Sequence, residues 1–324
     1  MADAISPSLT TLFAELLQQV ETAPEAGSVY RRISDSGEYL YAKVKVGSGR
    51  IDRFVGKAGD PAAELQANAL TAGAQLAKER RKLVGMLKGQ GRLAAPDRTM
   101  GLILDVLAQA GLFKSGAVLV GTAAYLVSEP LVGHRLPSPT LMTGDLDLAT
   151  ATVAICSTPP ERLEDILRRA DDTFEGIPQV DPKAPPSRYR NSAGYLVDLL
   201  TPTRTRDDTN PVRLRGLDAG AAPLQYLAWL IADAVPAVAL SGPGILVQVP
   251  QPARFAVHKL ILAQRRDAAN RIKRTKDLQQ AKAIIQALRA QDPYGLEDAL
   301  ADAFAQGETG WAQPIKRSLQ ELGL

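Results

Sequence analysis

Two carboxylates alternate with leucines in the stretch Thr143-Gly144-Asp145-Leu146-Asp147-Leu148. The alternation predicts a strand, extended by residues 146–156, because successive strand side chains point to opposite faces of a sheet. Asp145 and Asp147 then share one face while the leucines enter the core. Carboxylates about 6–7 Å apart along a strand can share hard cations. The pattern therefore favours a metal site, and the alternative is a solvated pair on a strand edge.

A third carboxylate stands among apolar residues in Leu196-Val197-Asp198-Leu199-Leu200. Residues 195–200 predict a second strand, stopped by Pro202. If the two strands are neighbours, Asp198 lies beside the first pair, and clustered carboxylates repel one another without a cation. Two magnesium ions about 3.5–4 Å apart can clamp the attacking and leaving oxygens of a phosphoryl-type displacement. The alternative for Asp198 is a cap on the turn after its strand.

The dipeptide Gly121-Thr122 follows a short apolar strand, residues 117–120, and opens a helix over residues 122–128. Backbone N–H groups at a helix start can bind phosphate, and glycine lets the phosphate approach closely. The threonine hydroxyl adds a donor. The alternative is a plain turn between a strand and a helix.

The remaining pattern predicts strands separated by helices, which favours an α/β fold with a mixed sheet. We expect further helices over residues 8–21, 61–89, 100–110, 159–170, 223–234, 255–266, 270–290 and 296–305. Strands are expected over residues 39–46, 51–55 and 237–249, the last broken by a Gly-Pro-Gly sequence.

Composition excludes several classes of protein. The chain has 324 residues, one cysteine (Cys156) and two histidines (His134 and His258), so a disulfide framework and a Cys-rich zinc site are excluded. No apolar run approaches the ~20 residues of a membrane span, and no signal peptide is visible. We therefore expect a cytoplasmic protein without a membrane partner. The net charge of +3 does not by itself indicate nucleic acid.

These motifs resemble the DNA polymerase beta-type nucleotidyltransferase superfamily, and more closely a bacterial nucleotidyltransferase family within it. The similarity covers most of the chain, and the stretches that carry it are residues 111–113, 118–122, 143–149, 255–260 and 276–281. The resemblance implies a small mixed sheet, two magnesium ions (manganese as an alternative), an NTP donor and pyrophosphate release. It implies that Asp145 and Asp147 bind both metals, that Asp198 binds the metal activating the acceptor hydroxyl, and that Gly121 and Thr122 hold the triphosphate. One departure is the 24-residue step from Gly121 to Asp145, which is longer than usual.

We accordingly expect three domains. Residues 1–95 form an N-terminal helix, β-hairpin and basic helix, residues 96–205 the nucleotidyltransferase core, and residues 206–324 a mainly helical C-terminal domain.

Several basic residues are further candidates for nucleotide binding. Lys259, early in an apolar helix, is either a phosphate ligand or a snorkelling surface lysine. Arg188 and Arg190, just before the Asp198 strand, either reach the nucleotide or solvate a loop. His258 is expected to be a satisfied structural histidine, and Asp277 a partner of an ion pair within its own helix.

The hairpin over residues 39–57 has a second kind of surface. Its outward face carries Tyr39, Tyr41, Lys43 and Lys45, followed by Arg50, Arg53 and Lys57. Interleaved aromatic and basic residues suit base stacking and phosphate contact. The alternative is an edge strand protected by lysines.

Two functions remain open from the sequence. The first is a magnesium-dependent enzyme that moves an NMP from an NTP to an acceptor hydroxyl, with an RNA end or a protein favoured as acceptor. The second is a nucleic-acid-binding or interaction protein on a decayed nucleotidyltransferase scaffold. The intact aspartates favour the enzyme.

Overall fold

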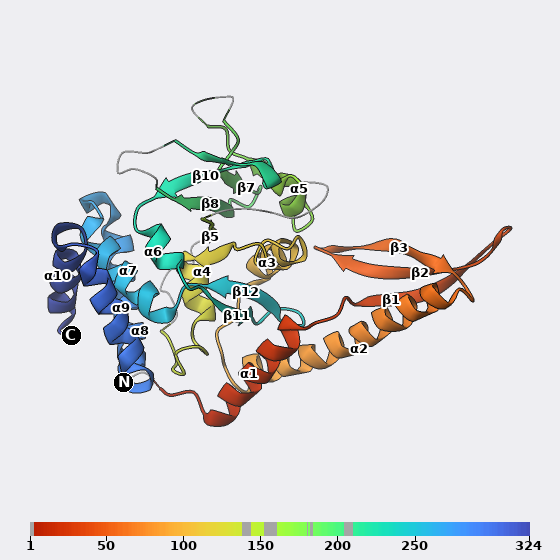
Figure 1. Ribbon diagram of the computed structural model, residues 1–324, viewed down its shortest axis with the longest axis horizontal. Coiled ribbons are helices and arrows are strands. Elements are labelled where there is room, and N and C mark those ends of the chain that lie inside the picture. The colour runs from red at the N-terminus through yellow and green to blue at the C-terminus, as the bar shows by residue number, and fades with distance from the viewer. Residues whose placement is uncertain (1–2, 138–143, 152–160, 180, 182–183, 204–209) are drawn as a thin grey trace.

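The computed structural model describes residues 3–137, 144–151, 161–179, 181, 184–203 and 210–324. Three parts follow one another along the longest axis of the molecule (Figure 1). An arm extends at one end, a sheet with short helices occupies the middle, and a group of helices forms the other end. The sheet therefore separates the arm from the C-terminal helices.

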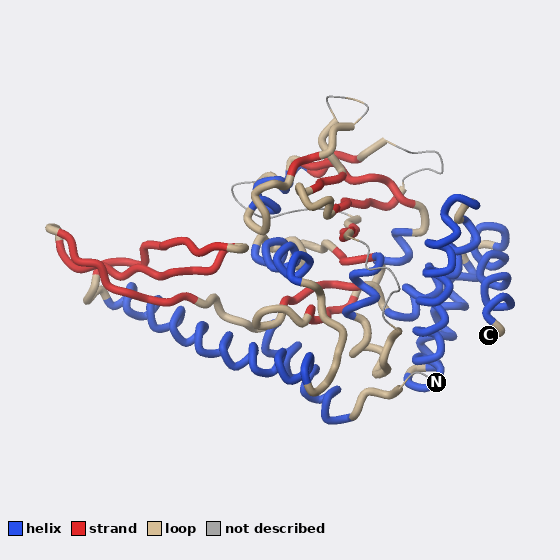
Figure 2. The backbone as a smooth tube through the Cα atoms, turned by 180° about the vertical axis from the view of Figure 1, so that it is seen from behind, coloured by secondary structure: helices blue, strands red, loops and turns tan. Residues whose placement is uncertain are grey.

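The arm is a three-stranded antiparallel sheet that lies along a long helix (Figure 2). Its strands are β1 (Gly27–Ser34), β2 (Gly37–Val46) and β3 (Gly49–Lys57), in that order, and its helix is α2 (Pro61–Gly89). Leu40 of β2 packs against Ala63 and Ala67 of α2, which fixes the face of the sheet that is covered. The sequence predicted β2, β3 and α2, but not β1, whose residues do not alternate strictly between apolar and polar types.

The turn between β2 and β3 attaches the arm to the rest of the molecule. The backbone N–H of Ser48 donates to the carbonyl oxygen of Arg169 at 2.9 Å, and Lys45 Nζ lies 2.6 Å from Asp105 Oδ2. Asp105 belongs to α3 (Arg98–Gln109) and Arg169 directly follows α5 (Leu163–Arg168). The opposite end of the arm projects away from the molecule (Figure 1).

Over the residues that the structure describes, the central sheet has seven strands of mixed direction. Its main order is β4 (Val118–Val120), β5 (Asp145–Ala149), β8 (Leu196–Pro202), β10 (Ala219–Leu224) and β9 (Val212–Leu214). β5 and β8 are parallel, whereas β4 is antiparallel to β5. A branch adds β7 (Arg188–Arg190), antiparallel to β8, and β6 (Glu175–Gly176) beyond it. Leu146, Leu148, Val197 and Leu199 enter the core from one face, as their alternation predicts.

Helices complete the fold. α1 (Pro7–Glu21) contacts α2 and a two-stranded sheet of β11 (Val235–Ala239) and β12 (Ile245–Val249). α4 (Gly121–Val127) follows β4, and α6 (Leu227–Ile231) follows β10. The C-terminal helices are α7 (Pro252–Arg265), α8 (Arg271–Gln291), α9 (Pro293–Ala305) and α10 (Gln313–Leu322). No helix in the described part of the chain is long and apolar enough to cross a membrane.

The predicted fold class is confirmed: the fold is mixed α/β, with a mixed sheet and a helical C-terminal region. The helix expected over residues 223–234 is wrong, because β10 occupies its beginning and α6 only its middle. A continuous apolar run has no period that separates strand from helix, and pairing with β8 decides the outcome. The strand expected over residues 146–156 ends at Ala149, and residues 152–160 lie outside the described residues. The helix expected over residues 159–170 is reduced to α5.

Candidate active site

The carboxylates of β5 and β8 are brought together by the register of two parallel strands. Asp147 lies directly opposite Asp198, and Asp145 lies opposite Leu196, one step along the same face. Neighbouring strands are about 4.7–4.9 Å apart, so the backbones of Asp147 and Asp198 are as close as residues on two strands can be. The three aspartates predicted from the sequence therefore share one face of the sheet.

Asp198 is paired with an arginine from the next strand. Arg188 of β7 lies opposite Asp198, and its Nε and a terminal nitrogen donate to the two carboxylate oxygens at 2.5 and 2.7 Å. This hydrogen bonding raises the pKa of Arg188. Among the residues that the structure describes, no three His, Cys, Asp or Glu side chains are grouped to hold a metal ion. Arg188 takes one acceptor position on each Asp198 oxygen, so a metal that uses Asp198 as a ligand has to compete with it.

Asp147 is a half-buried carboxylate with two other carboxylates beside it. Burial, followed by the charges of Asp145 and Asp198, raises its pKa to about 6, while Lys259 and Arg188 act in the opposite direction. A carboxylate with this environment gains free energy from any additional cation close to it.

Gly121 lies against the Asp147 carboxylate. A Cβ at position 121 would collide with Asp147 Oδ2, and the backbone φ of Gly121 is +65°, a region that favours glycine. Val120, the residue before it, pairs with Asp147 across β4 and β5. The turn from β4 into α4 therefore passes beside the carboxylates, as the sequence predicted, and Thr122 follows in the first turn of α4.

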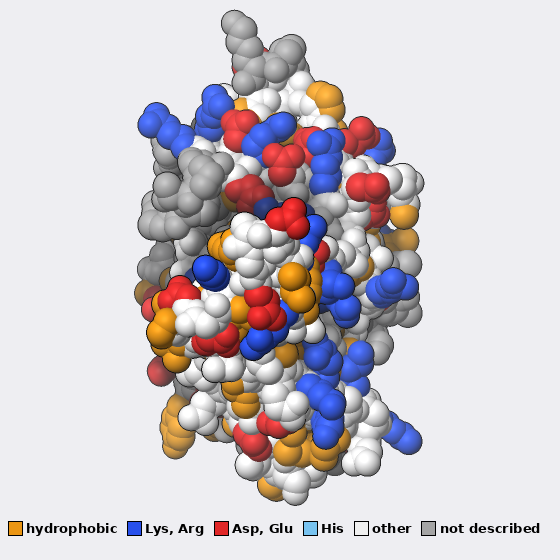
Figure 3. Space-filling model, turned by 90° about the vertical axis from the view of Figure 1, so that its right-hand side faces the viewer, with side chains coloured by type: hydrophobic (Ala, Val, Ile, Leu, Met, Phe, Trp, Pro, Cys, Tyr) orange, Lys and Arg blue, Asp and Glu red, His pale blue; other side chains and the backbone are white. Residues whose placement is uncertain are grey.

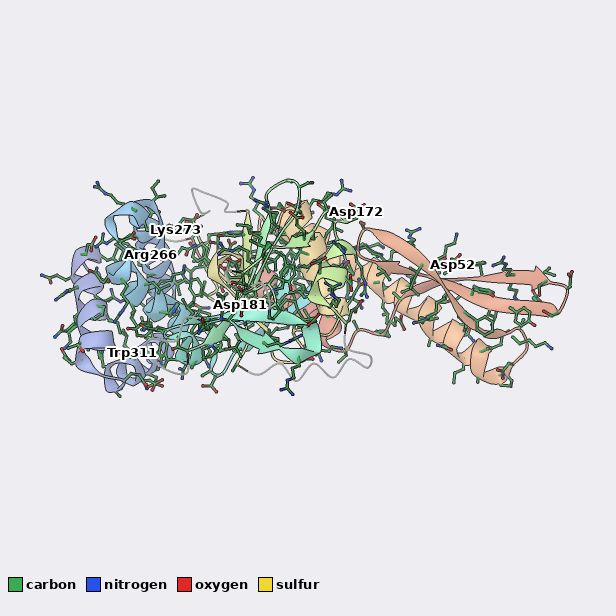
Figure 4. All side chains as sticks on the ribbon, turned by 90° about the horizontal axis from the view of Figure 1, so that it is seen from above. Asp52, Asp172, Asp181, Arg266, Lys273 and Trp311 are labelled. Carbon is green, nitrogen blue, oxygen red and sulfur yellow. The ribbon has the colours of Figure 1, made fainter. Side chains whose placement is uncertain are left out.

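A group of cations approaches the carboxylates from the C-terminal helices. Lys259 of α7 is only 7% exposed, and its Nζ lies 2.7 Å from Asp277 of α8. Arg266, which follows α7, is the second partner of Asp277, at 3.0 Å. The alternative of a snorkelling surface lysine is thus wrong for Lys259, and so is the expectation of an ion pair within the helix of Asp277. Figure 4 places Arg266 among the C-terminal helices, with Lys273 nearby.

Two residues of this site were missed by the sequence reasoning. Lys276 of α8 lies within electrostatic reach of Asp145 and Asp147, although burial and Lys259 lower its pKa. The Tyr195 hydroxyl, just before β8, is buried without a hydrogen-bond partner among the described residues, and burial, Asp97, Asp145 and Asp147 raise its pKa. Lys276 begins one of the stretches that carry the resemblance and stands in a basic run, but it was not singled out, and Tyr195 has the pattern of an ordinary strand residue.

Two other candidates lie apart from the carboxylates. Arg190 is exposed, lies opposite Leu196, and has Glu175 as an ion-pair partner at 3.9 Å. His258 is buried, and its Nε2 has no hydrogen-bond partner in the described part of the chain, so the expectation of a satisfied histidine is wrong. Burial, with the charge of Lys259, lowers the pKa of His258 to about 3.

Comparison with known proteins identifies the class to which this site belongs. A family model described as Nucleotidyltransferase matches residues 98–305, which include every candidate residue of the site. The chain therefore belongs to this nucleotidyltransferase family, and the arm lies outside the matched region. It is also similar to the crystal structure of an antigenic nucleotidyltransferase-like protein from Paracoccidioides brasiliensis, at 18% sequence identity, over 69% of this chain and 94% of that chain, with a TM-score of 0.33. Comparison with curated protein sequences gives no match.

Proposed function

We propose that the chain transfers an NMP from an NTP to an acceptor hydroxyl, with release of pyrophosphate, by the chemistry of the DNA polymerase beta-type superfamily. The observation that carries the proposal is the register that aligns Asp147 with Asp198 and leaves Asp145 on the same face. Family membership supports a nucleotide as the donor. The acceptor is an RNA end or a protein hydroxyl.

The donor set suits magnesium or manganese. Hard divalent cations prefer carboxylate oxygens. Burial, and after it the charges of Asp145 and Asp198, raises the pKa of Asp147 although Lys259 and Arg188 oppose the shift. Asp145 and Asp147 would hold both ions, and Asp198 one of them once Arg188 has moved. When bound, the ions would neutralise the triphosphate and lower the pKa of the acceptor hydroxyl.

The remaining residues have separate roles in this proposal. The backbone N–H groups at the start of α4 and the Thr122 hydroxyl would donate to phosphate oxygens. Lys259 and Lys276 would supply point charges to the β- and γ-phosphates, since both reach the carboxylates electrostatically. Once Arg188 leaves Asp198, it would bind a phosphate oxygen, which is negatively charged as the carboxylate is. Arg190, on the same strand face, would contact the outer part of the nucleotide.

One observation favours the second candidate, a binding protein on a nucleotidyltransferase scaffold. The bidentate contact between Arg188 and Asp198 occupies both oxygens of the third carboxylate. If that contact never opens, the site binds nucleotide without catalysing transfer.

The test is transfer of label from each α-³²P-labelled NTP, with cell extract as the source of acceptors, followed by separation of RNA, protein and metabolites. The proposal expects magnesium-dependent label in RNA or protein, and none after chelation of the metal. NTP binding that stabilises the protein thermally, with no label in any fraction, would establish the binding scaffold instead.

A further inference from the structure

The uncovered face of the arm sheet gathers aromatic and basic side chains. We call it the outer face, and its members alternate with the residues that pack on α2. By register they are Tyr30 and Arg32 of β1, Tyr39, Tyr41, Lys43 and Lys45 of β2, and Arg50, Asp52, Phe54 and Lys57 of β3. Arg53, which the sequence placed on this face, lies on the other face and pairs with Glu25.

The aromatic rings form one connected group across all three strands. Tyr30 stacks on Tyr41 with ring centroids 5.9 Å apart, and Phe54 lies 5.5 Å from Tyr41 and 6.0 Å from Tyr39. Phe54 is 56% exposed. The three tyrosines are half-buried, and a row of rings that is fixed by mutual contact offers flat surfaces at little entropic cost.

The charges around the rings are mostly positive, and most of these cations have no ion-pair partner among the described residues. Arg32 lies 5.8 Å from the Tyr41 ring and Lys43 lies 5.5 Å from the Tyr30 ring. The acid of this face, Asp52, lies opposite Lys43, and Lys45 is paired with Asp105. No described residue forms an ion pair with Arg32, Lys43, Arg50 or Lys57. Figure 3 views the molecule from its arm end, where most lysine and arginine side chains lie on the right-hand side.

Protection of an edge strand does not explain the tyrosines and the lysine on β2. Lysines blunt edge strands against pairing with another chain, but β1 and β3 flank β2 on both sides. Tyr39, Tyr41 and Lys43 stand on that central strand. The finding of β1 therefore removes this alternative for β2, whereas Arg32, Arg50 and Lys57 stand on the flanking strands β1 and β3.

We infer that the outer face binds a single-stranded polynucleotide. Exposed rings stack with bases of any sequence, and adjacent cations contact the phosphates. Asp52 is an exposed acid on this face, and the cations around it outnumber it. Arg32, Lys43, Arg50 and Lys57 give this face an excess of positive charge. This excess favours a polyanion as the partner rather than a protein.

The position of the arm suggests what the bound strand does. The arm projects from one end of the molecule, whereas Lys259 and Lys276 approach the carboxylates from the helices at the other end (Figure 1). Only an extended ligand can contact the outer face and the aspartates together. If the proposed transfer function holds, the strand bound on the arm supplies the acceptor hydroxyl at its end.

The test is a fluorescence anisotropy titration in EDTA with a labelled single-stranded RNA of about 12 nucleotides. A DNA strand of the same sequence and an RNA duplex serve as further probes. We expect Lys43→Glu/Arg50→Glu to weaken single-strand binding at least tenfold. The slope of log affinity against log salt should fall by about 1.4 for two lost contacts. Phe54→Ala should weaken binding on the order of tenfold with an unchanged salt slope. The matched control is Lys78→Glu/Lys82→Glu, an equal change of charge on exposed positions of α2.

Binding of RNA and DNA strands alike supports the inference. It is overturned if the wild type binds no strand, if the duplex binds more tightly, or if the α2 control weakens binding as much as the outer-face variant. Binding is measured without metal, and Asp145→Asn should bind like the wild type. An inactive but RNA-binding protein would therefore reject the transfer function alone, and an active protein that binds no strand would reject the arm's role alone.

Discussion

The face of the central sheet that carries the three aspartates and the outer face of the arm are both strand faces with side chains on alternate residues, yet their charges are of opposite sign. The first groups Asp145, Asp147 and Asp198 on one face of the sheet, and Asp147 lies half-buried beside the other two charges. The second exposes its rings and cations to solvent. We conclude that single substitutions should have large effects in the sheet and smaller effects on the arm, which depend on salt where a cation is lost.

The largest expected effect is that of Asp145→Asn. Loss of a carboxylate ligand from the proposed site should lower kcat at least ~1,000-fold, about 4 kcal/mol of transition-state stabilisation. The measurement is initial rate of label transfer together with thermal unfolding, which should stay near the wild type. Asp172→Asn, at an exposed position (Figure 4), is the control and should keep full activity. Activity of Asp145→Asn within tenfold of the wild type would refute its role as a ligand.

The pair Lys259–Asp277 separates structure from function within the buried region. Lys259→Met should lower the free energy of unfolding by about 3 kcal/mol, because removal of one partner leaves a buried charge less well compensated. It should also raise the KM for NTP. Lys259→Met/Asp277→Leu should recover most of the stability, since Arg266 is partly exposed and can be hydrated. The KM should stay high in the double variant; a normal KM there would make Lys259 purely structural.

Gly121→Ala tests the contact between the β4–α4 turn and Asp147. An alanine held at the φ of +65° found at Gly121 lowers stability by about 1 kcal/mol. The new Cβ would also displace the Asp147 carboxylate. Gly111→Ala is matched to it, because Gly111 has a φ of +79° and a Cβ added there would meet no atom within 4 Å. We expect similar losses of stability but a loss of kcat, on the order of tenfold, for Gly121→Ala alone. Equal rates in both variants would show that the turn does not position Asp147.

The pH dependence of stability should come from the buried region. His258 has a folded-state pKa of about 3 and an unfolded-state pKa near 6.5. Because the unfolded chain takes up the proton first, stability is complete above pH 6.5 and falls as the pH is lowered toward 3, by up to about 1.4 kcal/mol per unit. Denaturant unfolding between pH 7 and 4 should show a weaker decline for His258→Leu. Lys43→Glu on the arm should leave the decline unchanged. If His258→Leu declines with the same slope as the wild type, the pH dependence does not come from His258.

The same contrast explains how far the sequence could predict the molecule. Asp145, Asp147 and Asp198 were predictable because strand alternation is a local property and their leucine neighbours mark the buried face. The partners of Asp198 and Asp277 were not, since Arg188, Lys259 and Arg266 reach them through pairing of separate elements. β1 was missed for a related reason. Its strand conformation depends on pairing with β2, and this pairing made Tyr39 and Tyr41 part of a central strand.

The central claim is that the three aspartates hold a pair of divalent cations once Arg188 releases Asp198. The most direct measurement is an anomalous difference map from crystals grown with Mn²⁺ and a non-hydrolysable NTP analogue. The account predicts two peaks about 3.5–4 Å apart, bounded by Asp145, Asp147 and Asp198, with the Arg188 guanidinium turned toward phosphate. Bound analogue with no peak at these carboxylates, and with Arg188 still on Asp198, would contradict it.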